Sequence, residues 1–151
     1  MNKKGVSPVI ATVLLIGIVI VLAATIFMWF RGMTQEAIIK FEKNVELVCD
    51  DVKFAASYSP EGVLAVSNDG NVPIFQMKAK ISGDGDYETK NLIDYGWPDN
   101  GLNQGGIFSE SVDFVGANQV ILSPVLIGKT EKGGDRTFAC DENRYGYEII
   151  I

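Results

Sequence analysis

Residues 6–30 form an uncharged run that most constrains what this chain can fold into. The run holds 25 residues without one Asp, Glu, Lys or Arg, and 14 of the 22 residues from Val9 to Phe30 are Val, Ile, Leu or Phe. About 20 apolar helical residues span the hydrocarbon core of a bilayer. A helix without a polar face lies either in lipid or inside a bundle of other helices. The composition leaves both environments open.

The residues that flank the run predict where its helix starts and how it is oriented. Ser7 is a favourable N-cap, and Pro8 suits the first helical position because its missing N–H would have no partner there. Lys3 and Lys4 precede the run and Arg31 follows it, which favours a cytoplasmic N-terminus and an external C-terminal part. The run is too long for the core of a cleaved secretory signal, so we expect the helix to stay in the mature protein.

A helical pattern continues beyond the apolar run. Apolar residues fall on one helical face at spacings of 3, 4 and 3, namely Ile38, Phe41, Val45 and Val48. We therefore expect the helix to extend to residue 48. The predicted segments are a leader at 1–5, a helix at 6–48 (apolar in 6–30, amphipathic in 31–48) and a β domain at 49–151.

After Cys49 the hydrophobic period becomes two, which is typical of half-buried strands. Alternating stretches recur between turns rich in Gly, Pro, Asn and Asp, at 52–58, 63–67, 75–81, 87–93, 107–115, 119–127, 136–140 and 145–151. Seven or eight short strands with regular turns predict an all-β sandwich. The predicted fold class is α+β, with a long N-terminal helix followed by this sandwich.

Charge and residue types exclude several functions. Residues 44–151 carry 8 basic and 17 acidic side chains, a net charge of −9, whereas residues 1–43 carry a net charge of +3. An acidic surface argues against nucleic acid as a partner. The chain has no histidine, the commonest general base and metal ligand, and no Ser, Asp and Glu pattern indicates an activated nucleophile. We predict no enzymatic activity, no metal and no cofactor.

Cys49 and Cys140 are the two cysteines of the chain. They form either two separate buried thiols or one disulfide. A domain exported behind an apolar helix lies in an oxidising compartment, which favours the disulfide. Such a bond would fasten the C-terminal part of the sandwich to the end of the helix.

Two other stretches are candidate binding sites. Three carboxylates alternate in a turn, Asp84, Asp86 and Glu88, and clustered carboxylates bind calcium. The other ligands and the glycine of an EF-hand loop are absent, so a solvated acidic turn explains them better. The Gly- and Asn-rich loop at 94–106 contains Tyr95 and Trp97. These aromatic side chains either contact a glycan or partner at the surface or, for Trp97, pack onto the sandwich.

The start of the chain resembles archaeal type IV pilin precursors over residues 3–15, KKGVSPVIATVLL. Those precursors have a class III signal peptide, a short leader that ends in basic residues and Gly. The resemblance implies that a prepilin peptidase recognises Lys3, Lys4 and Gly5 and cuts between Gly5 and Val6.

Two further comparisons with pilins bear on this resemblance. Bacterial type IV pilins carry Glu at the fifth mature position, where this chain has Ile10, whereas the archaeal group usually lacks that Glu. The turn at 68–74, NDGNVPI, is similar to a turn in archaeal pilin and archaellin-type domains. Those domains are immunoglobulin-like sandwiches, so the resemblance implies that fold here.

The resemblance implies a structural subunit that polymerises through its N-terminal helix into an extracellular pilus-like filament serving adhesion. Its partners would be identical subunits, the prepilin peptidase, an assembly ATPase and membrane platform, and the membrane before assembly. Small residues would let neighbouring helices approach closely, namely Ala11, Gly17, Ala23 and Ala24. The alternative is a membrane-anchored external β domain that binds a ligand, or a minor pilin, which does not form the bulk filament.

Overall fold

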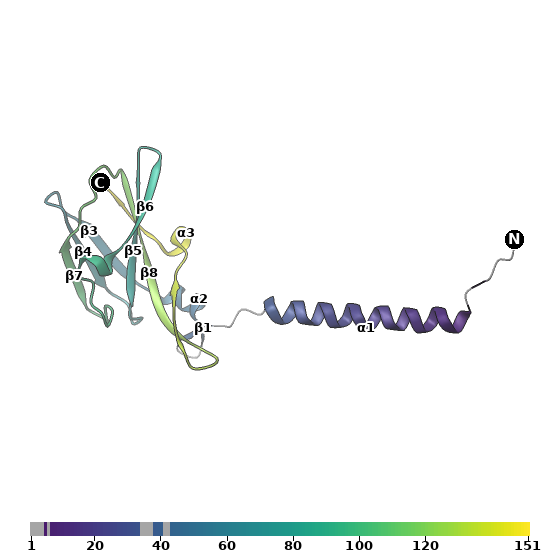
Figure 1. Cartoon of the computed structure of the whole chain (residues 1–151). Coiled ribbons are helices and arrows are strands. Elements are labelled where there is room, and N and C mark those ends of the chain that lie inside the picture. Colours follow the sequence, from purple (N-terminus) through teal and green to yellow (C-terminus); the bar gives the residue numbers. More distant parts are fainter. Residues whose placement is uncertain (1–4, 6, 34–37, 41–42) are drawn as a thin grey trace. The chain divides into compact units, whose positions relative to one another are not determined.

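Helix α1 spans Pro8–Met33 and begins where the sequence predicts. Ser7 stands directly before it, and the Ser7 carbonyl accepts the N–H groups of Ile10 at 3.0 Å and Ala11 at 3.2 Å. Pro8 at the first helical position therefore removes no helical hydrogen bond. The computed structural model describes residues 5, 7–33, 38–40 and 43–151. The chain divides into two units, residues 1–36 with α1 and residues 37–151, which we call the β domain (Figure 1).

The prediction that one helix continues to residue 48 is wrong, because residues 31–33 belong to α1 but residues 38–40 form a strand. The described elements here are β1 (Ile38–Lys40), β2 (Lys43–Asn44), the short helix α2 (Val45–Val48) and the 3-10 helix η1 (Cys49–Asp51). β1 pairs with β2 and also with Lys129 and Thr130, far along the chain. Two consecutive β-branched residues suit a strand, and this distant pairing overrides the local helical spacing. Residues 34–37 and 41–42 lie outside the described residues.

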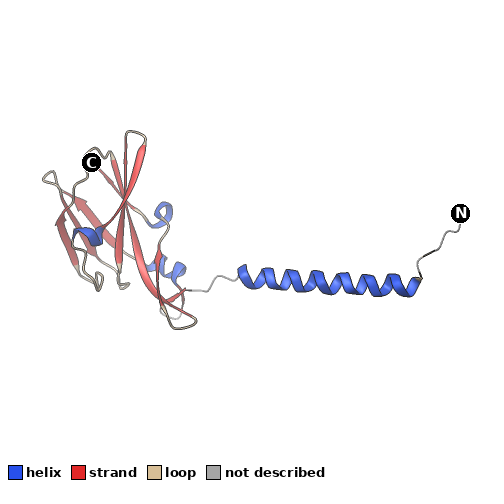
Figure 2. Cartoon of the chain, viewed as in Figure 1, coloured by secondary structure: helices blue, strands red, loops and turns tan. Residues whose placement is uncertain are grey.

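The β domain is built from two antiparallel sheets (Figure 2). The larger sheet has the strand order β2-β1-β8-β5-β6, and β9 and β10 also pair with β8. Besides β1 and β2, its strands are β5 (Gln76–Gly83), β6 (Asp86–Asn91), β8 (Gln119–Thr130), β9 (Asp135–Ala139) and β10 (Tyr147–Ile150). The smaller has the order β3-β4-β7, with β3 (Phe54–Tyr58), β4 (Val63–Asn68) and β7 (Ile107–Ser111). The short helices η2 (Leu92–Tyr95) and α3 (Glu142–Tyr145) join strands. The predicted α+β class is confirmed, while an immunoglobulin-like strand connection stays a prediction.

The core lies between the facing sides of the two sheets. Leu64 and Val66 of β4 and Met77 and Ala79 of β5 are buried, and the residues between them are half-buried. This alternation follows from the period of two in the sequence, because successive strand residues point to opposite faces. Side chains from both sheets, including Phe108 of β7, form one hydrophobic cluster.

Strand β8 has partners along both of its edges. On one edge β5 pairs with residues 119–125 and β1 with 129–130, and on the other β10 pairs with 119–122 and β9 with 125–129. Pro124 lies between the parts paired with β10 and β9, where a missing donor disturbs the ladder least. Its carbonyl accepts the N–H of Cys140 at 2.9 Å.

Candidate assembly helix and interior sites of the β domain

Helix α1 presents apolar side chains to its surroundings on every side. All side chains from Pro8 to Phe30 are exposed, and the large hydrophobic ones are 55–68% exposed. Residues 8–30 are long and apolar enough to cross a membrane by length and composition. Burial of such side chains is worth about 1.5–3 kcal/mol for each Val, Leu, Ile, Phe or Met. The helix is therefore stable only in lipid or against other helices.

The two threonine hydroxyls of α1 are satisfied within the helix itself. The Thr12 hydroxyl donates to the Val9 carbonyl at 2.9 Å, and the Thr25 hydroxyl donates to the Leu22 carbonyl at 2.8 Å. An unpaired hydroxyl in an apolar medium costs several kcal/mol, and these bonds remove that cost. Both threonines can therefore lie inside a membrane or a dry bundle.

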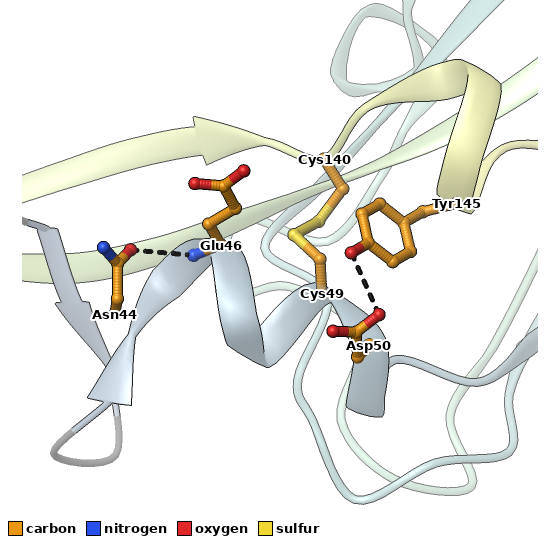
Figure 3. Close-up of a disulfide and its surroundings, with 6 residues drawn as sticks. All are labelled: Asn44, Glu46, Cys49, Asp50, Cys140 and Tyr145. Atoms are coloured by element: carbon orange, nitrogen blue, oxygen red, sulfur yellow. Dashed lines mark hydrogen bonds between the residues drawn. A yellow bond between two sulfur atoms is a disulfide. The ribbon is translucent and has the colours of Figure 1, made fainter.

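The cysteines are joined in a disulfide between Cys49 in η1 and Cys140 after β9 (Figure 3). Their Cα atoms lie 5.9 Å apart, and the two cysteines are 91 positions apart in sequence. Both side chains are buried in a small second cluster with Val45, Val48 and Leu126. The bond thus links the first helical turns of the β domain to the segment that follows β9.

Hydrogen bonds support the elements on both sides of the disulfide (Figure 3). The Asn44 side chain caps α2 by accepting the Glu46 N–H at 3.1 Å, and the Tyr145 hydroxyl donates to Asp50 at 2.9 Å. Partial burial, and then this hydrogen bond, raise the pKa of Tyr145 above its usual value. The phenol therefore keeps its proton, and its hydrogen bond to Asp50, to a higher pH than a free tyrosine would.

Asn68, at the end of β4, holds the turn after β4 against the loop before β7. Its side chain is fully buried and donates to the carbonyls of Val72 at 2.9 Å and Leu102 at 2.8 Å. The side-chain oxygen Oδ1 of Asn68 accepts the Gly70 N–H at 3.1 Å. The sequence predicted a tight turn here but not this central role, although Asn followed two residues later by Gly is the signal of an Asx turn.

We expect Asn68→Ala to lower the free energy of unfolding by about 2–4 kcal/mol, because the buried Val72 carbonyl and Gly70 N–H lose this partner and the Leu102 carbonyl keeps only the Ile74 N–H. A methyl side chain at this position could replace none of these bonds. Urea unfolding of the full chain in detergent measures the change. Asn71→Ala is the matched control, since Asn71 is exposed in the same turn and its replacement should change stability by less than about 0.5 kcal/mol. Equal effects of the two variants would contradict the assigned role.

Comparison with known proteins concerns α1 and the residues that flank it. Residues 4–38 match the family model of the archaeal type IV pilin, N-terminal. The N-terminal segment is thus similar to that of archaeal type IV pilins. No curated protein matches the chain. A solved structure titled "X-ray structure of Northeast Structural Genomics Consortium target SoR45" is 9% identical over 69% of this chain and 89% of its own, with a TM-score of 0.34, which is too low to carry an argument.

The match supports a pilin subunit, and pilins are structural subunits. Lys3, Lys4 and Val6 of the predicted recognition and cleavage site lie outside the described residues. Gly5 and Ser7 are described and exposed, directly before α1. Their roles in processing stay predictions.

The small residues of α1 do not share one face. At 100° per residue, Gly17 and Ala24 lie about 20° apart around the helix axis, whereas Ala11 and Ala23 lie about 120° apart from each other. Gly17 lies in a shallow apolar depression of about 340 Å³, lined by Val13, Leu14, Ile18, Val21 and Leu22. A helix packed on one side of α1 could therefore contact Gly17 and Ala24 together but not all four residues.

Of the two alternatives for Trp97, the structure shows packing onto the sandwich and contradicts a surface contact. Trp97 is 2% exposed, its indole N–H donates to the Phe75 carbonyl at 3.0 Å, and its ring packs against Phe108. A large aromatic ring gains more from burial in the core than from exposure once its N–H has a partner. Tyr95 is half-buried and also packs against the core. A surface contact at Tyr95 stays a prediction.

The acidic turn at 84–86 is explained by its backbone. Asp84 and Gly85 have φ angles of 44° and 91° and join β5 to β6 between the paired residues Gly83 and Asp86. A two-residue hairpin loop with two positive φ angles favours Asp-Gly. Within residues 5, 7–33, 38–40 and 43–151, no group of three or more His, Cys, Asp or Glu side chains is placed to hold a metal ion.

Proposed function

We propose that this pilin polymerises through α1 into an extracellular filament that serves adhesion. The observation that supports the proposal is the exposure of every side chain from Pro8 to Phe30 on a helix with no polar face. Such a helix needs an apolar environment on all sides, and a bundle of identical helices provides one. Because lipid tails and apolar side chains are alike, the helix exchanges one environment for the other at little hydrophobic cost.

The precursor would first be a single-pass membrane protein with a cytoplasmic N-terminus and an external β domain. A prepilin peptidase would remove residues 1–5, and with them the charged side chains of Lys3 and Lys4, which hold that end at the membrane surface. An assembly ATPase and a membrane platform would then move the helix from lipid into the filament. The disulfide suits an external β domain, because stable disulfides persist in oxidising compartments.

Electron microscopy of material sheared from cells tests the proposal. We expect filaments that contain the mature chain and sediment at high speed without detergent. Deletion of the gene should remove them, and its re-expression should restore them. If the chain instead stays with membranes and becomes monomeric in detergent, the function is that of a membrane-anchored binding domain or a minor pilin.

We expect the mature N-terminus to be Val6. The leader Lys-Lys-Gly directly precedes the uncharged run, which is the arrangement that the pilin resemblance associates with cleavage. N-terminal sequencing of sheared material measures the cut. Gly5→Leu should leave the uncut precursor in the membrane, whereas Asn2→Ala, further from the bond, should be processed normally. An assembled form that begins at Met1 or Asn2 would contradict the prediction.

A further inference from the structure

The outer face of the smaller sheet carries no charge. Strand register places its outward-pointing residues in adjacent rows, with Ser67 between Ala55 and Ile107, and Ala65 between Ser57 and Ser109. The whole face, which we call the uncharged face, consists of Ala55, Ser57, Val63, Ala65, Ser67, Ile107, Ser109 and Ser111. Each of these residues is exposed or half-buried. The face is therefore accessible within the β domain.

The other outer face of the β domain is different. Lys78 and Lys80 of β5 point away from the core, on the opposite side of the strand from Met77 and Ala79. Lys80 forms an ion pair with Glu142 of α3, which packs against β8. The larger sheet thus has charged side chains and a covering helix on its outside. The uncharged face has no charged side chain in the middle of a domain with a net charge of −9 over residues 44–151.

The charge pattern indicates what approaches this face. A basic partner would be attracted to the many carboxylates elsewhere on the domain and not to a neutral sheet. A partner with the same negative charge is repelled by the rest of the surface, so it can approach closely where no charge is present. A second copy of this chain is such a partner.

The side chains suit a close contact between backbones. Ala and Ser leave a shallow groove of about 150 Å³ lined by residues of all three strands. Ile107 of β7 forms one wall of this groove, and 71% of its surface is exposed. Small side chains let another surface approach the sheet, and Ile107 provides the largest apolar contact. The result is one apolar projection in the wall of a groove on the same face.

The size of the face limits how it works. Three strands about 4.8 Å apart and five residues long, at about 3.3 Å per residue, cover on the order of 200 Å². A stable interface of standard size buries about 800 Å² on each partner. The face is thus too small to hold two free β domains together. It can act when another interaction already holds the copies close, which raises their effective concentration.

We propose that the uncharged face is the surface through which the β domain contacts a neighbouring copy in the filament. The inference rests on the proposed function, because polymerisation through α1 supplies the high local concentration. Parallel helices give a filament two different ends, so the face meets a different surface of the neighbour and not its own equivalent.

Cysteine labelling of the full chain tests the inference. Ser109→Cys lies on the uncharged face, and the matched controls Thr137→Cys and Thr89→Cys lie exposed on β9 and β6 of the larger sheet. A membrane-impermeant maleimide is applied to intact filaments and to subunits dispersed in detergent. We expect labelling of Ser109→Cys to be at least about tenfold slower in filaments than in detergent, because attack needs an accessible thiolate. At least one control should be labelled at similar rates in both states.

Each outcome separates the inference from the proposed function. Filaments in which Ser109→Cys reacts as fast as in detergent would overturn the inference and leave the proposed function standing. Equal protection of all three positions would also count against it, because protection would not be specific to the face. A glycan found by mass spectrometry on Ser67 or Ser109 would overturn it, since a sugar prevents close contact. Absence of filaments from the wild-type chain would refute the proposed function and this inference together.

Discussion

Gly17→Asp is expected to abolish filament assembly. Gly17 lies near the middle of the apolar span and lines an apolar depression. A carboxylate at the centre of a membrane helix costs about 2.5–3.5 kcal/mol even on the most lenient scale. That cost corresponds to a shift of about 60- to 300-fold in the equilibrium for insertion or assembly. Quantification of sheared filaments by immunoblot and electron microscopy measures the effect.

Gly17→Ala is the matched control for this variant. No heavy atom lies within 4 Å of a Cβ built at Gly17, and Ala favours a helix over Gly by about 1 kcal/mol. The control should insert normally and give far more filaments than Gly17→Asp. A normal filament yield from Gly17→Asp would show that this part of α1 is not buried in the assembled state.

Removal of the disulfide should produce the largest loss of stability in the β domain. The double variant Cys49→Ser with Cys140→Ser opens a loop of 91 residues, for which chain entropy gives about 4–5 kcal/mol, and often less in practice. The two cysteines are also buried among apolar side chains. Serine hydroxyls at these positions would pack less well and would be costly to bury among apolar groups without hydrogen-bond partners. Thermal unfolding in detergent should show Tm lowered by about 10 °C or more.

Two controls accompany the disulfide variant. Wild-type chain treated with reductant should unfold at nearly the same temperature as the double variant, because both lack the same bond. Membrane insertion of the double variant should be normal, since insertion depends on α1. A Tm equal to that of the oxidised wild-type chain would mean that the bond contributes nothing to the folded β domain.

Strong periodic patterns in the sequence predicted most of the fold. The uncharged run gives α1, and the alternation around Leu64 and Met77 gives β4 and β5, because each pattern is fixed by neighbours along the same element. The prediction of one continuous helix through residue 48 is wrong, since residues 38–40 form β1, which depends on pairing with Thr130, about 90 residues away. Local spacing contains no information about such a partner. The short helices η2 and α3 were also not predicted, because elements of four residues lack a periodic signal.

The interior sites were harder to predict than the helix. Two cysteines permit one intramolecular pairing, so predicting the disulfide required only a decision between an oxidising and a reducing compartment. Burial of Trp97 depends on the carbonyl of Phe75, which accepts its N–H, and on the ring of Phe108, which the sequence does not place together. Asn68 likewise acts through Leu102, 34 residues later. In each case the role follows from contacts made across the domain.

The partners of β8 determine when the β domain can finish folding. β1, at the beginning of the β domain, pairs with residues 129–130 of β8, and Cys49 forms a disulfide with Cys140. Contacts between distant residues form slowly, because the chain loses entropy before it gains them. A ribosome or translocation channel that delivers the chain from its N-terminus releases residues 38–49 long before their partners. The residues that follow α1 therefore lack their strand and disulfide partners until nearly the whole chain has emerged. Subunits with an incomplete C-terminal part would contain a folded helix but an incompletely folded β domain.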